Sequence, residues 1–229
     1  VEALQFDGSL NRGLYVAENI DGLVDGVAAT SKLPLNQMTA EAWFTIDDHH
    51  IEFAGLLAVQ QDSALCKRGW ALTYGRVTGG ESGDFLFHFS IAVEGTFLSP
   101  AGGFSMASIH VHGIVKGEWN FISATYNGSF ISVYYAQSNH TWLKVEKQAC
   151  RRPPCGKIVY PAAYHIGNGD SCVAGRTPLT IGTYDNQAQA SNSPHIGAIK
   201  HVKISNQSFS EAQVKDSHDL ISQLMRDTP

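Results

Sequence analysis

The chain has 229 residues, of which 43% are hydrophobic, a formal net charge of −5 and an isoelectric point near 6.0. Its length suits a single all-β domain, and its hydrophobic content is sufficient to bury a sizeable core. The slightly acidic balance provides no electrostatic surface for nucleic acid or an anionic membrane, and no apolar run approaches membrane-spanning length.

Short strands separated by turn residues are predicted through the first half of the chain. They cover residues 3–6, 14–16, 39–46, 53–60, 69–74, 85–93 and 106–111. Between Thr39 and Ile46 the apolar residues recur at every second position, with Trp43 on the opposite face, as the alternation of a strand requires. Strands at such short intervals indicate a sandwich rather than βαβ units.

A hairpin is predicted over residues 117–135. Its two strands, Trp119–Tyr126 and Phe130–Tyr135, carry bulky side chains on both faces, which is typical of a strand deep inside a two-sheet sandwich. Asn127-Gly128 between them predicts a type I′ turn, because that turn needs positive φ at both central residues.

The last third of the chain combines an irregular excursion, short strands and a helix. Residues 150–170 are rich in Pro and Gly, and strands are predicted at 142–145, 179–182 and 197–204. Ser210 and Gln213 have the spacing of a capping box, and Phe209 and Val214 that of a hydrophobic staple. The helix has one apolar stripe, which must pack on a neighbouring surface and contains Val214, Leu220, Ile221, Leu224 and Met225.

Six blocks follow one another in an order that is specific for fold. They are Leu4–Gly8 with Leu14–Val16, Met38–Phe44, Gly117–Gly128, Leu179–Gly182, Gly197–Ile204 and Phe209–Val214. Over nearly the whole chain they resemble the concanavalin A-like lectin/glucanase superfamily, specifically its laminin G-like and pentraxin-like jelly rolls. The resemblance implies that Trp43 and Trp119 are core residues of the sandwich.

The fold class expected from these patterns is all-β. We predict a two-sheet antiparallel jelly-roll sandwich over residues 1–208 and a short C-terminal helix over residues 209–226, within one laminin G-like domain spanning 1–229. Because Val1 does not begin a signal peptide, we expect a mature form or a domain excised from a larger protein.

The resemblance also bears on a calcium ion. Relatives can hold Ca²⁺ in the region of the last strand together with the Asp of the first block, which is Asp7 here; Asp185, in the loop after Leu179–Gly182, and nearby backbone carbonyls are the further candidate ligands, in a structural role. Lys200 stands where the family often has an acidic residue, and this substitution weakens such a site.

Glucanases of this superfamily need two carboxylates, two or four residues apart on one strand, to act as acid and as base or nucleophile. No such pair occurs in the chain, and Glu41 is the single acid on its strand. We therefore predict that the domain is not an enzyme and has no catalytic residues.

Cysteines and glycosylation sequons indicate an oxidising, extracellular setting. Three pairings are possible for Cys66, Cys150, Cys155 and Cys172, and spacing favours Cys150 with Cys155, which leaves Cys66 with Cys172. No CxxC pair occurs, which argues against a zinc site of thiolates. The three N-glycosylation sequons start at turns or strand ends and lie at Asn127, Asn139 and Asn206.

His110 and His112 are two residues apart on a predicted strand, so both rings face one side with a workable metal-ligand spacing. His49 and His50 could add ligands. No third ligand is visible at a fixed offset, so a polar sheet face that carries scattered histidines is the favoured interpretation.

Aromatic side chains are the usual platforms for sugar rings, and binding residues are over-represented in loops. The candidate ligand-binding residues are Trp70, Trp142, Tyr160, Tyr164 and His165, with packing in the core as the alternative for each.

Three functions are considered. The first is a secreted or cell-surface, lectin-like binding domain, as in cell adhesion, which recognises a glycan or a protein surface without catalysis. The second is an accessory domain that packs on a catalytic domain of the same polypeptide, and the third is a glycan hydrolase or lyase. We expect neither nucleic-acid binding nor membrane insertion.

Overall fold

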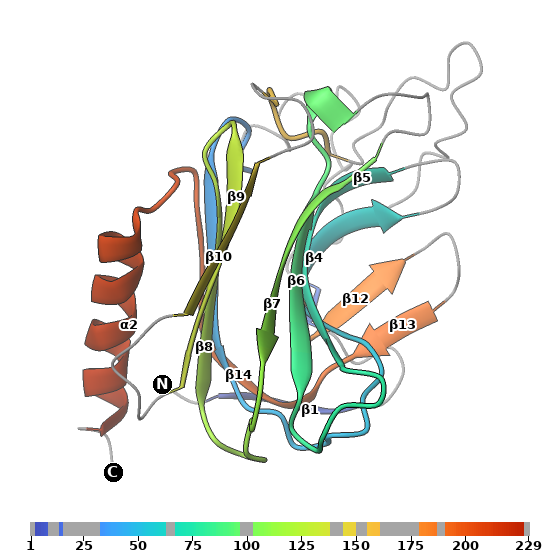
Figure 1. The fold of residues 1–229 in the computed structure, drawn as a ribbon, viewed down its shortest axis with the longest axis vertical. Coiled ribbons are helices and arrows are strands. Elements are labelled where there is room, and N and C mark those ends of the chain that lie inside the picture. Colours follow the sequence, from blue (N-terminus) through green and yellow to red (C-terminus); the bar gives the residue numbers. More distant parts are fainter. Residues whose placement is uncertain are drawn as a thin grey trace.

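A computed structural model describes residues 3–8, 14–15, 33–62, 67–96, 103–137, 144–149, 155–160, 179–186 and 191–226. Two six-stranded antiparallel sheets pack face to face, and helix α2 (Glu211–Arg226) lies on the outside of one of them (Figure 1). The predicted all-β sandwich with a C-terminal helix is confirmed.

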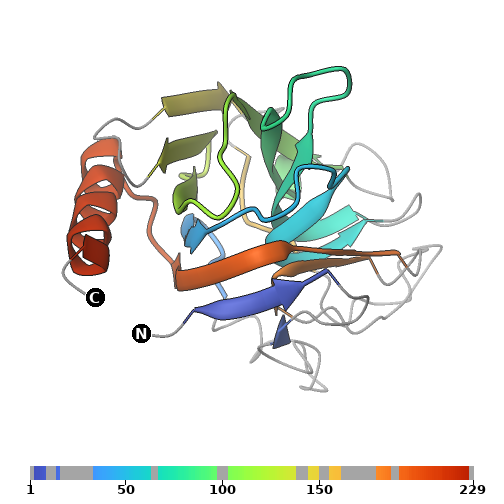
Figure 2. The ribbon, with the colours of Figure 1, turned by 90° about the horizontal axis from the view of Figure 1, so that it is seen from below.

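The first sheet joins strands from both ends of the chain. Its order is β1 (Leu4–Asp7), β14 (Ile196–Ser205), β3 (Met38–Phe44), β8 (Asn120–Tyr126), β9 (Phe130–Gln137) and β10 (Lys144–Ala149). Figure 2 shows β1 and β14 side by side, in register from Leu4 opposite Ile199 to Asp7 opposite Ile196.

The second sheet contains most of the remaining strands. Its order is β2 (Leu14–Tyr15), β11 (Thr180–Ile181), β4 (Ala54–Asp62), β5 (Lys67–Arg76), β6 (Phe85–Ile91) and β7 (Ser105–Val111). A two-stranded ribbon, β12 (Thr183–Asn186) and β13 (Ser191–Pro194), lies against β4, and a short 3₁₀ turn, η1 (Glu94–Thr96), follows β6. The ribbon was not predicted.

The core between the sheets is rich in aromatic rings. Phe87 lies 5.5 Å from Phe44 and 5.4 Å from Tyr135 between ring centroids, so β6 of one sheet contacts β3 and β9 of the other. Successive residues of β6 alternate between buried and partly exposed, which is the period of two that a strand with one core face must show.

Helix α2 covers the outer face of the first sheet. Trp43, Phe121 and Tyr134 pack there against Val214 of the helix. Every residue of β8 is therefore buried, on one side by the second sheet and on the other by α2. This double cover is the physical reason for the bulky residues on both faces of the predicted hairpin strands.

The helix begins as predicted. The Ser210 amide donates to Gln213 Oε1 at 2.9 Å and the Gln213 amide to Ser210 Oγ at 3.4 Å, which is a capping box. The predicted stripe is only partly correct, because Leu220 and Leu224 are exposed. In the part of the chain that the structure describes, no helix combines the length and apolar character needed to cross a membrane.

The β8–β9 turn differs from the prediction by one residue. The Asn127 amide donates to the Phe130 carbonyl at 3.2 Å, so Gly128 and Ser129 are the central pair. Among the described turn residues only Gly128, at φ 90°, has positive φ. A glycine at the first central position is the pattern of a type II′ turn, and the predicted type I′ turn was wrong.

Trp43 is buried as expected, whereas Trp119 is only partly buried and packs against the core cluster that contains Trp43. Trp119 precedes β8 and is partly exposed, and the Lys200 ammonium lies 4.2 Å from the centre of its ring. Lys200 is therefore engaged in a cation–π contact at the margin of the helix-covered face.

Candidate functional site

Trp70 and Tyr160 belong to the core, which corrects their assignment to a binding surface. Trp70 faces the other sheet from β5 and is 0% exposed, and Tyr160 is 1% exposed. The Trp70 indole donates to Tyr160 Oη at 3.1 Å, and that hydroxyl donates to the Pro34 carbonyl at 2.7 Å. Because the indole N–H and the phenol hydroxyl are both hydrogen-bonded, these two side chains can lie in the core without an unsatisfied polar atom. The other candidates, Trp142, Tyr164 and His165, lie outside the described residues.

Helix α2 covers the outer side of the first sheet, whereas the β12–β13 ribbon lies on the outer side of the second sheet at β4 (Figure 1). We call the side chains that point away from the core on β5, β6 and β7 the outer face, and they are Thr73, Leu86, His88, Ser90, Met106, Ser108 and His110. Register places Thr73, His88 and Ser108 in one row across the three strands.

Small polar groups occupy the middle of the outer face. His88 Nδ1 lies 2.7 Å from Ser108 Oγ, and the Gln60 amide donates to Ser90 Oγ at 2.8 Å. Burial lowers the pKa of His88, so its ring is neutral near pH 7. Thr73 is buried, so the uncharged donors and acceptors that this row offers to a ligand are those of His88 and Ser108.

The β12–β13 ribbon brings aromatic residues to one margin of this face. Tyr184 packs over Ala58 and Ala71, and its ring meets Phe53 edge to face, with centroids 5.5 Å apart. The ribbon can lie this close because Gly55 has no side chain. A Cβ at this position would stand only 2.4 Å from the ribbon backbone. Phe53 is 41% exposed and presents an apolar ring at this margin. Neither Tyr184 nor Phe53 was predicted as a site residue, because the sequence of the ribbon that brings them together shows only a short strand pattern.

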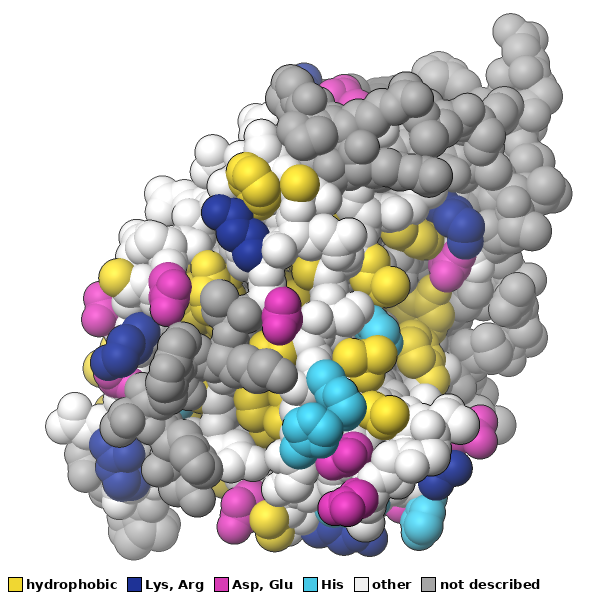
Figure 3. All heavy atoms as spheres, in the orientation of Figure 1, with side chains coloured by type: hydrophobic (Ala, Val, Ile, Leu, Met, Phe, Trp, Pro, Cys, Tyr) yellow, Lys and Arg dark blue, Asp and Glu magenta, His cyan; other side chains and the backbone are white. Residues whose placement is uncertain are grey.

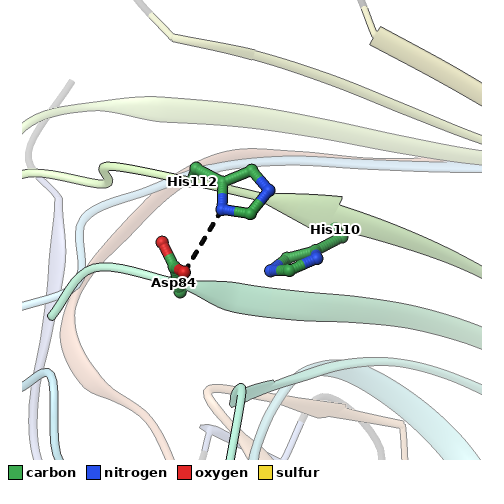
Figure 4. A group of neighbouring side chains, drawn as sticks. All are labelled: Asp84, His110 and His112. Atoms are coloured by element: carbon green, nitrogen blue, oxygen red, sulfur yellow. Dashed lines mark ion pairs between the residues drawn. The ribbon is translucent and has the colours of Figure 1, made fainter. Parts of the chain in front are cut away.

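Asp84, His110 and His112 form a second feature at the edge of the same sheet (Figure 4). Asp84 Oδ2 and His112 Nδ1 are 3.2 Å apart, and the two imidazole centroids are 4.0 Å apart. The prediction that both rings face one side is confirmed. His49, proposed as a further ligand, instead has Nδ1 3.1 Å from Ser82 Oγ.

The sequence also indicated that Asp84 lies near the two histidines, which the spacing of His110 and His112 alone does not show. Asp84 directly precedes one predicted strand and His112 directly follows the next. Consecutive strands usually pair antiparallel, so the start of one meets the end of the other. Burial raises the pKa of Asp84, but the His112 ring and the amides of Glu81 and Gly113 outweigh it and hold that pKa below its usual range.

Glu41 has a structural environment. It is 2% exposed under α2, where Ser217 Oγ donates to Oε2 at 2.8 Å and Ser123 Oγ donates to Oε1 at 3.2 Å. Burial raises its pKa, opposed by these hydroxyls and by Lys203. A cavity of about 320 Å³ lies beside it between the helix and the first sheet. The carboxylate thus ties the helix to β3 and β8.

The predicted calcium ligands are only partly described. Asp7 is exposed at the end of β1, whereas the Lys200 side chain is directed to Trp119. The side chain of Asp185 lies outside the described residues, and the Ca²⁺ site stays a prediction.

Cys155 is buried and disulfide-bonded. The other three cysteines lie outside the described residues, so the pairing stays a prediction. Asn127 and Asn206 are exposed at turns, where the sequons require them to be, and Asn139 lies outside the described residues. Occupancy of the sequons also stays a prediction.

No known protein family matches the chain at the level of sequence. No curated protein matches it either. Solved structures match its fold. One is the CBM40 domain of the Ruminococcus gnavus IT-sialidase bound to α2,3-sialyllactose, with a TM-score of 0.58 and 12% identity over 95% of this chain and 96% of that chain.

A second match is the enzymatically active domain of tailspike protein 2 from bacteriophage CBA120. It has a TM-score of 0.50 and 13% identity, and covers 95% of this chain but only 30% of the tailspike chain. At these identities the comparisons show the fold. They agree in coarse terms with the predicted lectin-like sandwich, whereas the laminin G-like assignment stays a prediction.

Proposed function

We propose that this chain is a non-catalytic glycan-binding domain whose binding surface is the outer face together with Phe53. The observation that carries the proposal is the exposed Phe53 ring at the ribbon margin of a sheet whose outer side also presents the uncharged His88 and Ser108. A sugar ring needs such a combination, because its apolar face stacks on an aromatic ring while its hydroxyls pair with fixed polar groups.

The fold supports this proposal without naming the ligand. The sandwich resembles a carbohydrate-binding domain whose solved structure holds sialyllactose. The seven outer-face residues include no lysine, arginine or carboxylate, and burial favours the neutral form of His88. Without a bound metal ion, a neutral glycan therefore matches this surface better than an acidic one, which would need a cation for its carboxylate.

Replacing Phe53 with alanine should weaken glycan binding at least about tenfold, which corresponds to about 1.4 kcal/mol. The aromatic stacking surface is lost, and stability should also fall by about 1–2 kcal/mol, because the ring packs edge to face on Tyr184. Binding is measured by calorimetry with the best ligand from an array that includes lactose and α2,3-sialyllactose.

Phe130→Ala is the matched control. This ring is 38% exposed, on the β8–β9 turn of the other sheet, so its loss should leave binding unchanged. Ser108→Ala, which removes a hydroxyl from the polar row, should weaken binding with little effect on the fold. Equal binding by Phe53→Ala, Ser108→Ala and the parent chain would contradict the proposal.

The absence of catalysis is part of the proposal. Glu41 is sealed under α2, and Asp84 is paired with His112, so neither is placed as one of two carboxylates flanking an open glycosidic bond. The accessory function remains the second candidate. It is favoured by Leu220 and Leu224, which expose apolar surface on α2 where a neighbouring domain could pack.

We also propose an extracellular location. The supporting observations are the disulfide-bonded Cys155 and the exposed sequons at Asn127 and Asn206. Protein from its native host should lose mass on treatment with an N-glycosidase, and the Asn127→Gln/Asn206→Gln double variant should show a smaller loss. A native protein of unmodified mass would count against N-glycosylation and weaken the case for secretion.

A further inference from the structure

We propose that Asp84, His110 and His112 form a binding site for a first-row divalent transition-metal ion of the zinc type. The protein would supply two imidazole nitrogens and one carboxylate oxygen and leave at least one coordination position open. This inference rests on the geometry of the three side chains and does not depend on glycan binding.

The antiparallel pairing of β6 and β7 builds the site. His110 and His112 are two residues apart along the end of β7, so they share the side of the sheet that points away from the core. Register pairs Phe85 with Val111, so Asp84, one residue before, stands opposite His112, one residue after. Two positions on one strand and one on its neighbour therefore converge on the same side.

The distances suit chelation. Two ligand atoms bound at about 2.0–2.2 Å to a tetrahedral zinc ion lie about 3.3–3.5 Å apart. Asp84 Oδ2 and His112 Nδ1 are already 3.2 Å apart, and one ligand atom from each of the three residues lies within 4.8 Å of the others. Figure 4 shows both rings and the carboxylate directed to the same small region.

The carboxylate is held in place before any ion arrives. The Glu81 amide donates to Asp84 Oδ2 at 3.3 Å, and the Asp84 backbone accepts from the Val77 amide and donates to the Glu81 carbonyl. The Asp84 side chain is 13% exposed and the His112 side chain 66% exposed. The ion would thus have a fixed oxygen ligand on the protein side and access to solvent on the other. Figure 3 shows histidine and acidic side chains together on this side of the surface.

A simple ion pair accounts for less of this arrangement. Asp84 and His112 could pair without a second imidazole, but the His110 ring lies 4.0 Å from that of His112. Imidazole ligands favour zinc, copper, nickel and cobalt, whereas calcium and magnesium require oxygen ligands in larger number. The donor set therefore separates this site from the calcium site expected at Asp7.

The test uses the folded chain, without a histidine tag, in equilibrium dialysis against Zn²⁺. One ion should bind per chain, and Asp84→Asn, His110→Ala and His112→Ala should each weaken that binding by more than about tenfold, since even indirect partners of metal ligands cost about 10–100-fold. With Cu²⁺ as a probe, electron paramagnetic resonance should show coupling to two nitrogens, and to one in either histidine variant.

His201→Asn is the matched control, because it removes a partly buried histidine from β14 of the other sheet. Asparagine tolerates the positive φ of 51° at this position. Circular dichroism and melting curves of the apo variants verify that each is folded. Zinc binding that is lost in all three ligand variants and kept in the control supports the site. Zinc binding that is undetectable in the parent chain, or equal in the parent and the ligand variants, would overturn it.

Discussion

Gly69→Ala should lower the free energy of unfolding by about 2–5 kcal/mol, combining the cost of a left-handed alanine with that of overpacking. Gly69 has a φ of +80°, and a Cβ there would lie 1.7 Å from the Val59 carbonyl oxygen. The backbone cannot easily move away, because the Gly69 amide donates to Val159 and its carbonyl accepts from Ala92. Urea denaturation of the disulfide-intact protein measures the loss.

Gly79→Ala separates the two contributions. Gly79 has nearly the same φ, +77°, but no atom lies within 4 Å of the position of its Cβ. This variant should lose only the conformational term, about 1–2 kcal/mol. If both alanine variants lost the same stability, close packing around Gly69 would not be the cause.

The second large effect is a loss of stability in acid that depends on His195. This side chain is 0% exposed, and its Nδ1 lies 2.8 Å from Tyr74 Oη. Burial lowers its pKa to about 4, although the Ala198 and Thr45 backbones oppose the shift. The unfolded chain, with an ordinary pKa near 6.5, therefore binds the proton first. The contribution of His195 to the free energy of unfolding is fully present above pH 6.5. It is lost as the pH drops towards 4, and the loss amounts to about 3 kcal/mol in all.

His195→Asn should remove this dependence. The asparagine side-chain amide can form a hydrogen bond with the Tyr74 hydroxyl in place of Nδ1, but it does not titrate. The comparison concerns the slope of unfolding free energy between pH 7 and 4, not the absolute stability of either protein. Burial also lowers the pKa values of His49, His88 and His201, so both proteins keep a shared smaller slope. Parallel curves would mean that His195 does not carry the effect.

The sandwich could be predicted from the sequence because its signals are local. The alternation around Trp43 and the Ser210–Gln213 spacing each describe interactions within a few residues, and both are confirmed. The predicted position of the β8–β9 turn was wrong by one residue, because Asn127 and Gly128 are both common in turns. Only the pairing of Tyr126 with Ile131 decides which two residues are central.

The candidate sites depended on contacts between strands, which a single sequence records poorly. Trp70 was a surface candidate because nothing in its neighbourhood shows that Tyr160 satisfies its indole across 90 residues. Phe53 becomes a surface ring through Tyr184 of the ribbon, which packs beside it from far along the chain. The histidine pair was visible, but its third partner, Asp84, required the register of two strands.

The place of β14 has a consequence for the order of folding. This strand lies between β1 and β3, so the first sheet lacks an interior member until residues 196–205 have left the ribosome. Until then β1 has no hydrogen-bonding neighbour in that sheet. The side chains of Trp43 and Phe121 stay uncovered until α2 has also been synthesised. Such long-range pairing slows folding and leaves strand edges exposed to other chains. Production of this protein should therefore depend on chaperones during late synthesis. A chain truncated before residue 196 should aggregate.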